Sequence, residues 1–215
     1  MKPSVLQHLD NLITRYPELS ILKINILNAA DMICESCKSD GKVLVCGNGG
    51  SAADSEHIVG ELMKGFVLPR KLKQSDIDSI KNAGFSDWKY LADSMQQGIP
   101  AIALTEHSAL SSAILNDNDP YMAFAQQTYV YGRPGDILIG ISTSGNARNV
   151  CNALKVGKAF GVKTIGFTGS KPSAMEDICD IMLKVPAQET FKVQEYHLPV
   201  YHALCIMIEE EIFGE

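Results

Sequence analysis

The sequence predicts an α/β fold in which helices cover both faces of a parallel sheet. Five short, continuous apolar segments are rich in β-branched residues, helical or polar stretches separate them, and glycine- or serine-rich turns follow two of them. Strands buried on both faces have this continuous apolar character, and their alternation with helices is typical of a parallel sheet. The expected strands are 42–46, 99–104, 136–141, 163–167 and 181–185, and the expected core helices are 51–66, 146–160 and 190–213.

The N-terminal segment, residues 1–38, predicts helices and no strand. Its apolar residues recur at spacings of three, four or seven, as they do on one face of a helix. Pro17 is expected to divide the segment into two helices, because proline lacks the backbone N–H that a helix interior needs. The turn residues Ser39, Asp40 and Gly41 then end the helical pattern and lead into the first strand.

One segment, residues 67–98, interrupts the alternation of strands and helices. It is polar, and it contains the single tryptophan, Trp88. A structureless loop of this length is unusual in a compact domain, so the segment is expected to hold one or two short helices. It is interpreted either as a lid or as a surface insertion with no part in catalysis. The whole chain, residues 1–215, is expected to form a single domain.

The composition limits the classes of function. The chain has 215 residues and a formal net charge of −6. This acidic balance argues against a direct nucleic-acid partner but leaves room for a local site that binds an anion. No apolar run approaches the roughly 20 residues of a membrane-spanning helix, and the amphipathic N-terminus lacks the pattern of a signal peptide. A cytoplasmic location without a membrane partner is therefore expected, and six cysteines scattered among apolar neighbours are compatible with it.

Two turns at the carboxyl ends of predicted strands indicate a phosphate site. Gly49 and Gly50 allow close approach of the backbone, and the helix that follows offers free N–H groups to an anion. Ser142, Thr143 and Ser144 offer three hydroxyl donors. The alternatives are a tight strand–helix turn and simple N-capping, but one cap needs only one hydroxyl. Both turns are expected to lie at the crevice where open α/β sheets bind ligands.

His57 and Glu61 form the first candidate for acid–base or metal chemistry. Their spacing of four places both side chains on one face of a helix. Imidazole and carboxylate together can hold zinc or act as acid and base. The alternative is a solvated surface contact between the two side chains.

The last helix carries Gln194, His197 and His202, which are further candidates for the same chemistry. A straight helix would separate the directions of Gln194 and His202 by about 80° around its axis. Pro199 lies between them and is expected to kink the helix. A histidine buried in the core is the alternative interpretation for either imidazole.

Three segments together resemble the sugar isomerase (SIS) domain family and, within it, the phosphoheptose isomerase branch. The segments are GKVLVCGNGGSAADSEHIVGELMKGF, GDILIGISTSGNARNV and VQEYHLPVYHALC, in that order. The resemblance implies a flavodoxin-like fold of five parallel strands flanked by helices. It also implies a homotetramer with active sites at the subunit interfaces. The insertion at residues 67–98 lies outside the resemblance.

The resemblance further implies an enzyme that interconverts a ketose phosphate and an aldose phosphate through an enediol. The expected substrate is sedoheptulose 7-phosphate, and the expected product is D-glycero-D-manno-heptose 7-phosphate. An isomerase of a different phosphosugar is one alternative, and a non-catalytic regulatory or assembly protein that binds a phosphosugar is another.

Individual roles follow from the same resemblance. Glu61 and His202 match the proposed base and acid. One Zn²⁺ per subunit is expected, with four matching ligands: His57, Glu61, Gln194 and His202. Residues matching the family's substrate contacts are Asn48, Gly49, Gly50, Ser51, Glu61, Asn116, Asp117, Ser142, Thr143, Ser144 and Gln194.

Several departures from the family pattern make the identity of the substrate the open question. Ala147 stands where the family has a serine that contacts the phosphate, and Phe191 stands where some members have an acidic residue. An arginine that usually follows the Glu61 segment is absent, and Lys64 or Arg70 is expected to take its place.

Overall fold

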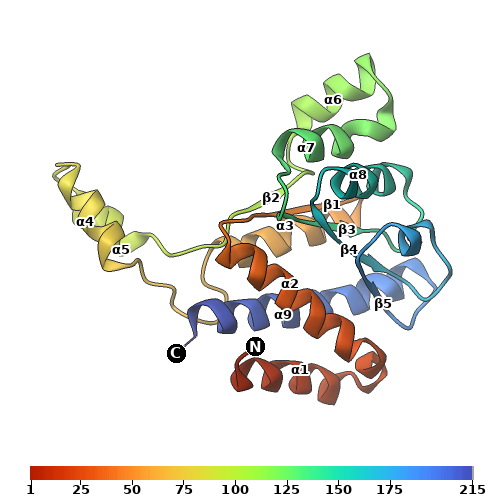
Figure 1. Cartoon of the computed structure of the whole chain (residues 1–215), viewed down its shortest axis with the longest axis horizontal. Coiled ribbons are helices and arrows are strands. Elements are labelled where there is room, and N and C mark those ends of the chain that lie inside the picture. Colours follow the sequence, from red (N-terminus) through yellow and green to blue (C-terminus); the bar gives the residue numbers. More distant parts are fainter. Residues whose placement is uncertain (215) are drawn as a thin grey trace.

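The computed structural model describes residues 1–214 (Figure 1). Within these residues, five parallel strands form one sheet in the order β2-β1-β3-β4-β5. This is the strand order of flavodoxin-like folds. The prediction of a five-stranded parallel α/β fold is therefore confirmed. The strands are β1 (Val43–Gly47), β2 (Ala101–Ala103), β3 (Ile137–Ile141), β4 (Lys163–Thr168) and β5 (Ile181–Lys184).

Helices cover both faces of the sheet, which explains why the strands are apolar throughout. Val43 and Val45 of β1 belong to one buried cluster, whereas Leu44 and Cys46 belong to a second. Successive side chains of a strand point to opposite faces, so each face has its own core. One face is covered by α2 (Lys23–Lys38), α3 (Gly50–Met63) and α9 (Thr190–Phe213), and the other by α7 (Ala123–Tyr131) and α8 (Arg148–Ala159) (Figure 1).

The first N-terminal helix forms an outer layer on α9. Helix α1 (Pro3–Arg15) buries Val5, Leu9 and Leu12, and the 3₁₀ turn η1 (Pro17–Leu22) joins it to α2. Pro17 is the first residue of that turn, where its missing N–H costs nothing. The predicted division of residues 1–38 at Pro17 is confirmed.

Residues 67–98 contain two short helices, α4 (Gln74–Asn82) and α5 (Trp88–Ser94), as predicted. An antiparallel bridge between Lys71 and Gln96 closes the base of this excursion, and we call residues 71–96 the arm. The arm projects away from the rest of the protein (Figure 1). The segment that follows the arm leads into the start of β2, at the amino ends of the strands and opposite their carboxyl ends. Within one chain, the arm therefore does not cover a ligand bound at those carboxyl ends.

A helical segment between β2 and β3 was not predicted from the sequence. It consists of α6 (Ser108–Asp117), the turn η2 (Pro120–Met122) and α7. Only Ile114 of α6 is buried, so that helix has no repeated apolar face to detect. A further short turn, η3 (Ala174–Asp177), precedes β5.

Helix α9 runs as one element from Thr190 to Phe213 with Pro199 inside it. Pro199, Val200 and Tyr201 are all buried against the core, and tertiary packing of this kind can compensate for the lost hydrogen bond. Among the helices described, none is both long and apolar enough to span a bilayer.

Candidate functional site

The glycine turn after β1 forms one wall of the candidate site. Gly49 adopts φ 56° and ψ −120°, a conformation that is open essentially to glycine alone. Helix α3 begins at Gly50, where a Cβ atom would lie only 2.3 Å from Nε2 of Gln194. The turn is also tied to α8, since the Asn48 and Asn149 amides exchange two hydrogen bonds of 2.8 and 2.9 Å. At the start of α3, the N–H groups of Ser51 and Ala52 donate to the carbonyl oxygens of Asn48 and Gly49 at 3.0 Å.

The hydroxyl turn after β3 forms the opposite wall. The Oγ atom of Ser142 accepts a hydrogen bond from the Ala147 N–H at 3.4 Å, and Ser144 Oγ accepts one from the Asn146 N–H at 3.2 Å. The two oxygens also lie 3.5 Å apart, so one hydroxyl can donate to the other while the second O–H is available to a ligand. Helix α8 begins at Arg148, two residues after the predicted start, because this turn extends to Ala147.

The two turns meet in one cavity of about 390 Å³, as predicted for the carboxyl ends of the strands. None of the lining residues in the described chain is charged. Backbone N–H groups, hydroxyls and amides are suited to a phosphate monoester without a fixed positive charge. The lining residues are Asn48, Gly49, Gly50, Ser51, Ile141, Ser142, Thr143, Ser144, Ala147, Thr190 and Gln194. Thr190 was not predicted, although it is a hydroxyl at the start of the last helix.

His57, Glu61 and His202 lie together between α3 and α9. Nε2 of His57 is 3.2 Å from Oε1 of Glu61, and the centroids of the His57 and His202 rings are 4.9 Å apart with the rings edge to face. Lys64 Nζ lies 3.1 Å from the other carboxylate oxygen, Oε2 of Glu61. Burial lowers the pKa of His202, and the neighbouring His57 lowers it further. His202 is therefore mostly neutral near pH 7, beside a carboxylate that can accept a proton.

The fourth expected zinc ligand, Gln194, borders a different hollow from His202. It lines the cavity beside Gly50, whereas His202 borders a separate hollow with Asn11 and Arg15 of α1. Over residues 1–214, no three or more His, Cys, Asp and Glu side chains are grouped as a metal site. The donor types nevertheless suit zinc, and Nε2 of His202 is buried without a hydrogen-bond partner.

Two predicted substrate contacts lie outside the cavity. Asn116 and Asp117 are exposed at the end of α6, and the Asn116 amide donates to Asp117 Oδ1 at 2.8 Å. Neither residue lines the cavity formed by the two turns. Their proposed contact with substrate stays a prediction.

Arg70 cannot replace the absent family arginine at the substrate. Its side chain is fully buried, and its Nε donates to Oε1 of Glu209 at 2.7 Å. Its other donors reach the carbonyl oxygens of Leu62 at 2.7 Å and Glu61 at 3.0 Å, at the end of α3. The expectation for Arg70 was wrong because the sequence does not reveal its buried partner. Lys64 remains the candidate.

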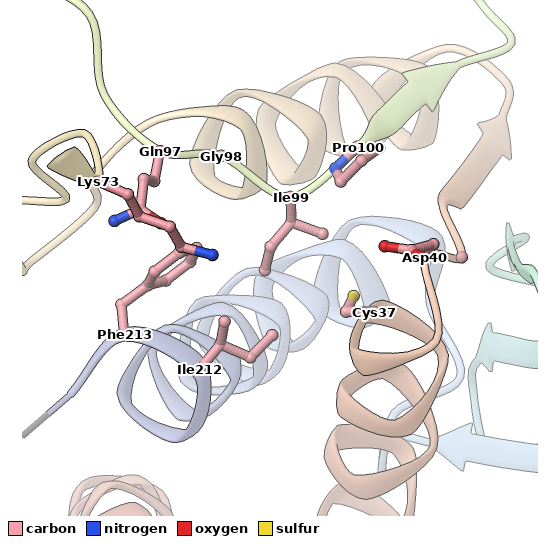
Figure 2. A pocket seen from close by; sticks show the side chains of 10 residues that line it. Cys37, Asp40, Lys73, Gln97, Gly98, Ile99, Pro100, Ile212 and Phe213 are labelled. Carbon is pink, nitrogen blue, oxygen red and sulfur yellow. The ribbon is translucent and has the colours of Figure 1, made fainter. Parts of the chain in front are cut away.

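A different pocket, of about 290 Å³, lies at the base of the arm (Figure 2). Figure 2 shows it bordered by Asp40 after α2, by Lys73 at the start of the arm, by Ile99 after the arm, and by Ile212 and Phe213 of α9. It opens at the amino ends of the strands and contains none of the predicted site residues. The candidate active site is therefore the cavity at the carboxyl ends, together with the Glu61 cluster on the helix that begins there.

Comparisons with known proteins identify the family of the chain. A family model described as the SIS domain matches residues 9–90 and 85–169. Phosphoheptose isomerase of Clostridium acetobutylicum is 38% identical over 190 residues, which are 88% of this chain and 84% of that protein. Phosphoheptose isomerase of Burkholderia pseudomallei is 37% identical over 194 residues, 90% of this chain and 85% of that protein. The structure of phosphoheptose isomerase GmhA from Neisseria gonorrhoeae matches with a TM-score of 0.73 at 30% identity, covering 96% of this chain and 97% of that one.

The structural match extends over nearly the whole chain, and the family model matches more than half of it. The chain belongs to the SIS domain family.

Proposed function

We propose that this chain is a phosphosugar isomerase that interconverts sedoheptulose 7-phosphate and D-glycero-D-manno-heptose 7-phosphate. The main support is the cavity between the glycine and hydroxyl turns, which has the donors for a phosphate. Helix α3 begins at this cavity and carries His57 and Glu61 further along. The relatives described above are phosphoheptose isomerases and match this chain at 37–38% identity over most of its length.

Holding the phosphate orients the open-chain sugar for the reaction. The α3 N-terminus and the hydroxyls of Ser142, Thr143 and Ser144 bind the phosphate. The carbonyl end of the sugar, remote from the phosphate, then lies toward Glu61. Binding energy from the phosphate is thereby used to position the reacting carbons.

Glu61 acts as the general base that moves a proton between C1 and C2 of the sugar. Its carboxylate is positioned by the His57 and Lys64 side chains, 3.2 and 3.1 Å away. His202 donates a proton to the carbonyl oxygen and later recovers it. Because its pKa is lowered, the neutral imidazole performs this exchange, and no fixed positive charge is needed.

We also propose that one Zn²⁺ binds to each subunit through His57, Glu61, Gln194 and His202. The buried, unpartnered Nε2 of His202 supports this assignment. A bound zinc ion would polarise the sugar oxygens and stabilise the negative charge that develops on them.

A homotetramer in the cytoplasm is the assembly and location that we propose. Ile21 and Ile24, at the junction of η1 and α2, are 68% and 72% exposed, which suits a surface covered by another subunit. All six cysteines are free thiols, as is usual in a reducing compartment. Light scattering on the purified protein tests the tetramer directly.

A substrate panel tests the proposed reaction. Purified protein is incubated with sedoheptulose 7-phosphate and with pentulose and hexulose phosphates, with and without Zn²⁺, and the aldose products are measured. We expect the highest kcat/KM for the heptulose. A higher value for a shorter sugar would overturn the heptose assignment and retain the isomerase. No turnover of any ketose phosphate by folded protein would overturn both.

A further inference from the structure

The hydroxyl group of Tyr201 lies within hydrogen-bonding distance of both the inner nitrogen of His57 and the carboxylate of Asp54. Neither Tyr201 nor Asp54 was predicted from the sequence as a site residue. Tyr201 of α9 is 1% exposed, and its hydroxyl oxygen lies 3.0 Å from Nδ1 of His57 and 3.3 Å from Oδ1 of Asp54. Asp54 and His57 are three residues apart on α3, so one hydroxyl can reach both. The outer nitrogen of the same ring, Nε2, faces Glu61.

The number of hydrogens available decides the direction of these bonds. A tyrosine hydroxyl has one hydrogen near neutral pH, because the ordinary pKa of tyrosine is about 10. Asp54 is an acceptor when ionised, and its Oδ2 atom is buried with no partner. If the hydroxyl donated to His57 instead, both oxygens of Asp54 would be left without a donor in the chain. Leaving a half-buried carboxylate without a donor is costly, so Tyr201 donates to Asp54.

The tyrosine oxygen then accepts a hydrogen bond from the N–H at Nδ1 of His57. We infer that Tyr201, held by Asp54, is a positioning residue that fixes the proton on Nδ1 of His57 and turns Nε2 toward Glu61. This inference deepens the proposed function and rests on it, because Glu61 is the proposed base.

The arrangement also has a consequence at the other nitrogen. His57 Nε2 and Glu61 Oε1 are 3.2 Å apart, a distance at which a nitrogen lone pair and a carboxylate repel unless a proton or a cation lies between them. Fixing Nδ1 as the donor therefore prepares Nε2 either to share a proton with Glu61 or to bind a metal ion. Outer partners of this kind orient metal-binding histidines in other proteins.

The chain offers a closely matched pair of variants to test the inference. Tyr201→Phe removes the hydroxyl and keeps the ring, which packs edge to face on His57 and His202 with centroids 5.4 and 5.0 Å away. Tyr196→Phe is the control, since this tyrosine lies on the same helix and its hydroxyl donates to exposed Glu18 at 2.7 Å, away from His57. Both variants delete one tyrosine–carboxylate hydrogen bond.

The first readout does not depend on isomerase activity. Nitrogen-15 NMR of histidine-labelled protein, with the His57 signals assigned through a His57→Gln variant, reports whether Nδ1 carries a proton. We expect Nδ1 to be protonated in the wild type and in Tyr196→Phe, and to lose that preference in Tyr201→Phe. If Tyr201→Phe fails to fold, Asp54→Leu, which removes the acceptor that holds the hydroxyl, is examined in the same way. An unprotonated Nδ1 in the wild type, or an unchanged signal in the variants, would overturn the inference.

The second readout is the affinity for Zn²⁺, measured by competition with a chromogenic chelator, together with kcat and KM. We expect Tyr201→Phe to weaken zinc binding and to lower kcat by ~10–100-fold, with KM unchanged. Equal losses in Tyr196→Phe would show a general effect on α9 and overturn the inference. If neither the wild type nor any variant isomerises a sugar phosphate, the proposed function fails. The role of Tyr201 at His57 still stands in that case, provided that NMR shows the expected change.

Discussion

Replacing Arg70 with methionine is expected to destabilise the protein strongly. The arginine is fully buried and donates to the Glu209 carboxylate and to the carbonyls of Glu61 and Leu62. Methionine fills much of the same space but supplies no donor, so Glu209 becomes a buried charge without a cation. Breaking a buried ion pair from one side costs about 3–5 kcal/mol.

The lower part of that range is expected because Glu209 keeps other partners. Its two oxygens also accept hydrogen bonds from the backbone N–H groups of Phe66, Val67 and Leu68, at 2.8, 2.8 and 3.1 Å. Leu62 O retains a bond from the Ile99 N–H at 2.9 Å. We therefore expect the free energy of unfolding to fall by about 3 kcal/mol.

The effect is expected to depend on pH. Burial alone would raise the pKa of Glu209, but the backbone N–H groups and Arg70 outweigh burial and lower it below its ordinary value. A lowered pKa contributes stability above the unfolded-state value, about 4.3, and that contribution is lost as pH falls through the folded-state pKa. The difference between wild type and Arg70→Met should therefore shrink in strong acid.

Urea unfolding followed by circular dichroism measures both quantities. Arg148→Met is the control, because Arg148 pairs at 3.6 Å with Asp119 on the surface, where both side chains are about half exposed. Such pairs contribute about 0–1 kcal/mol. A loss for Arg70→Met no larger than that of the control, or a loss that does not change with pH, would refute the reasoning.

Other outcomes follow from single side chains. Burial lowers the pKa of His197 to about 4, so the imidazole is neutral in the folded protein at pH 7. The unfolded chain protonates this imidazole below about pH 6.5, and the folded protein therefore loses about 3 kcal/mol of stability between pH 6.5 and 4. His197→Met should remove that acid sensitivity in urea unfolding, and an unchanged sensitivity would contradict the assignment. Ser142→Ala should raise KM by about tenfold with kcat nearly unchanged, since one hydrogen bond to a charged phosphate is worth about 1.5–3 kcal/mol. An unaltered KM in steady-state kinetics would count against the phosphate site. Gly50→Ala places a Cβ atom 2.3 Å from Gln194 Nε2, which is the end of a flexible side chain. KM should therefore rise with little change in melting temperature. A large drop in melting temperature would mean that the Gln194 amide cannot move.

The parallel sheet and both turns of the site could be predicted from the sequence because their signals are local. The continuous apolar strands and the glycine and serine turns are each contained in a few neighbouring residues. The structure brings Gly50 and Ser142 to one cavity because both follow parallel strands of the same sheet. This follows from topology and needs no knowledge of side-chain contacts.

The missed features depend on partners far along the chain. Arg70 was expected to contact the substrate because its buried partner, Glu209, is 139 residues away in the sequence. Tyr201 looks like an ordinary core residue until α9 is packed on α3. Helix α6 was missed for a different reason, because with Ile114 alone buried it has no apolar periodicity.

The central claim is that Glu61 transfers a proton in a phosphate-anchored sugar. The most direct test follows the conversion of sedoheptulose 7-phosphate in D₂O by wild type and by Glu61→Gln, with folding of both proteins checked by circular dichroism. We expect an aldose product with deuterium at C2 and a loss of about 10²–10⁴-fold in kcat for Glu61→Gln. Product formation without solvent deuterium, or an unchanged kcat in the variant, would contradict it.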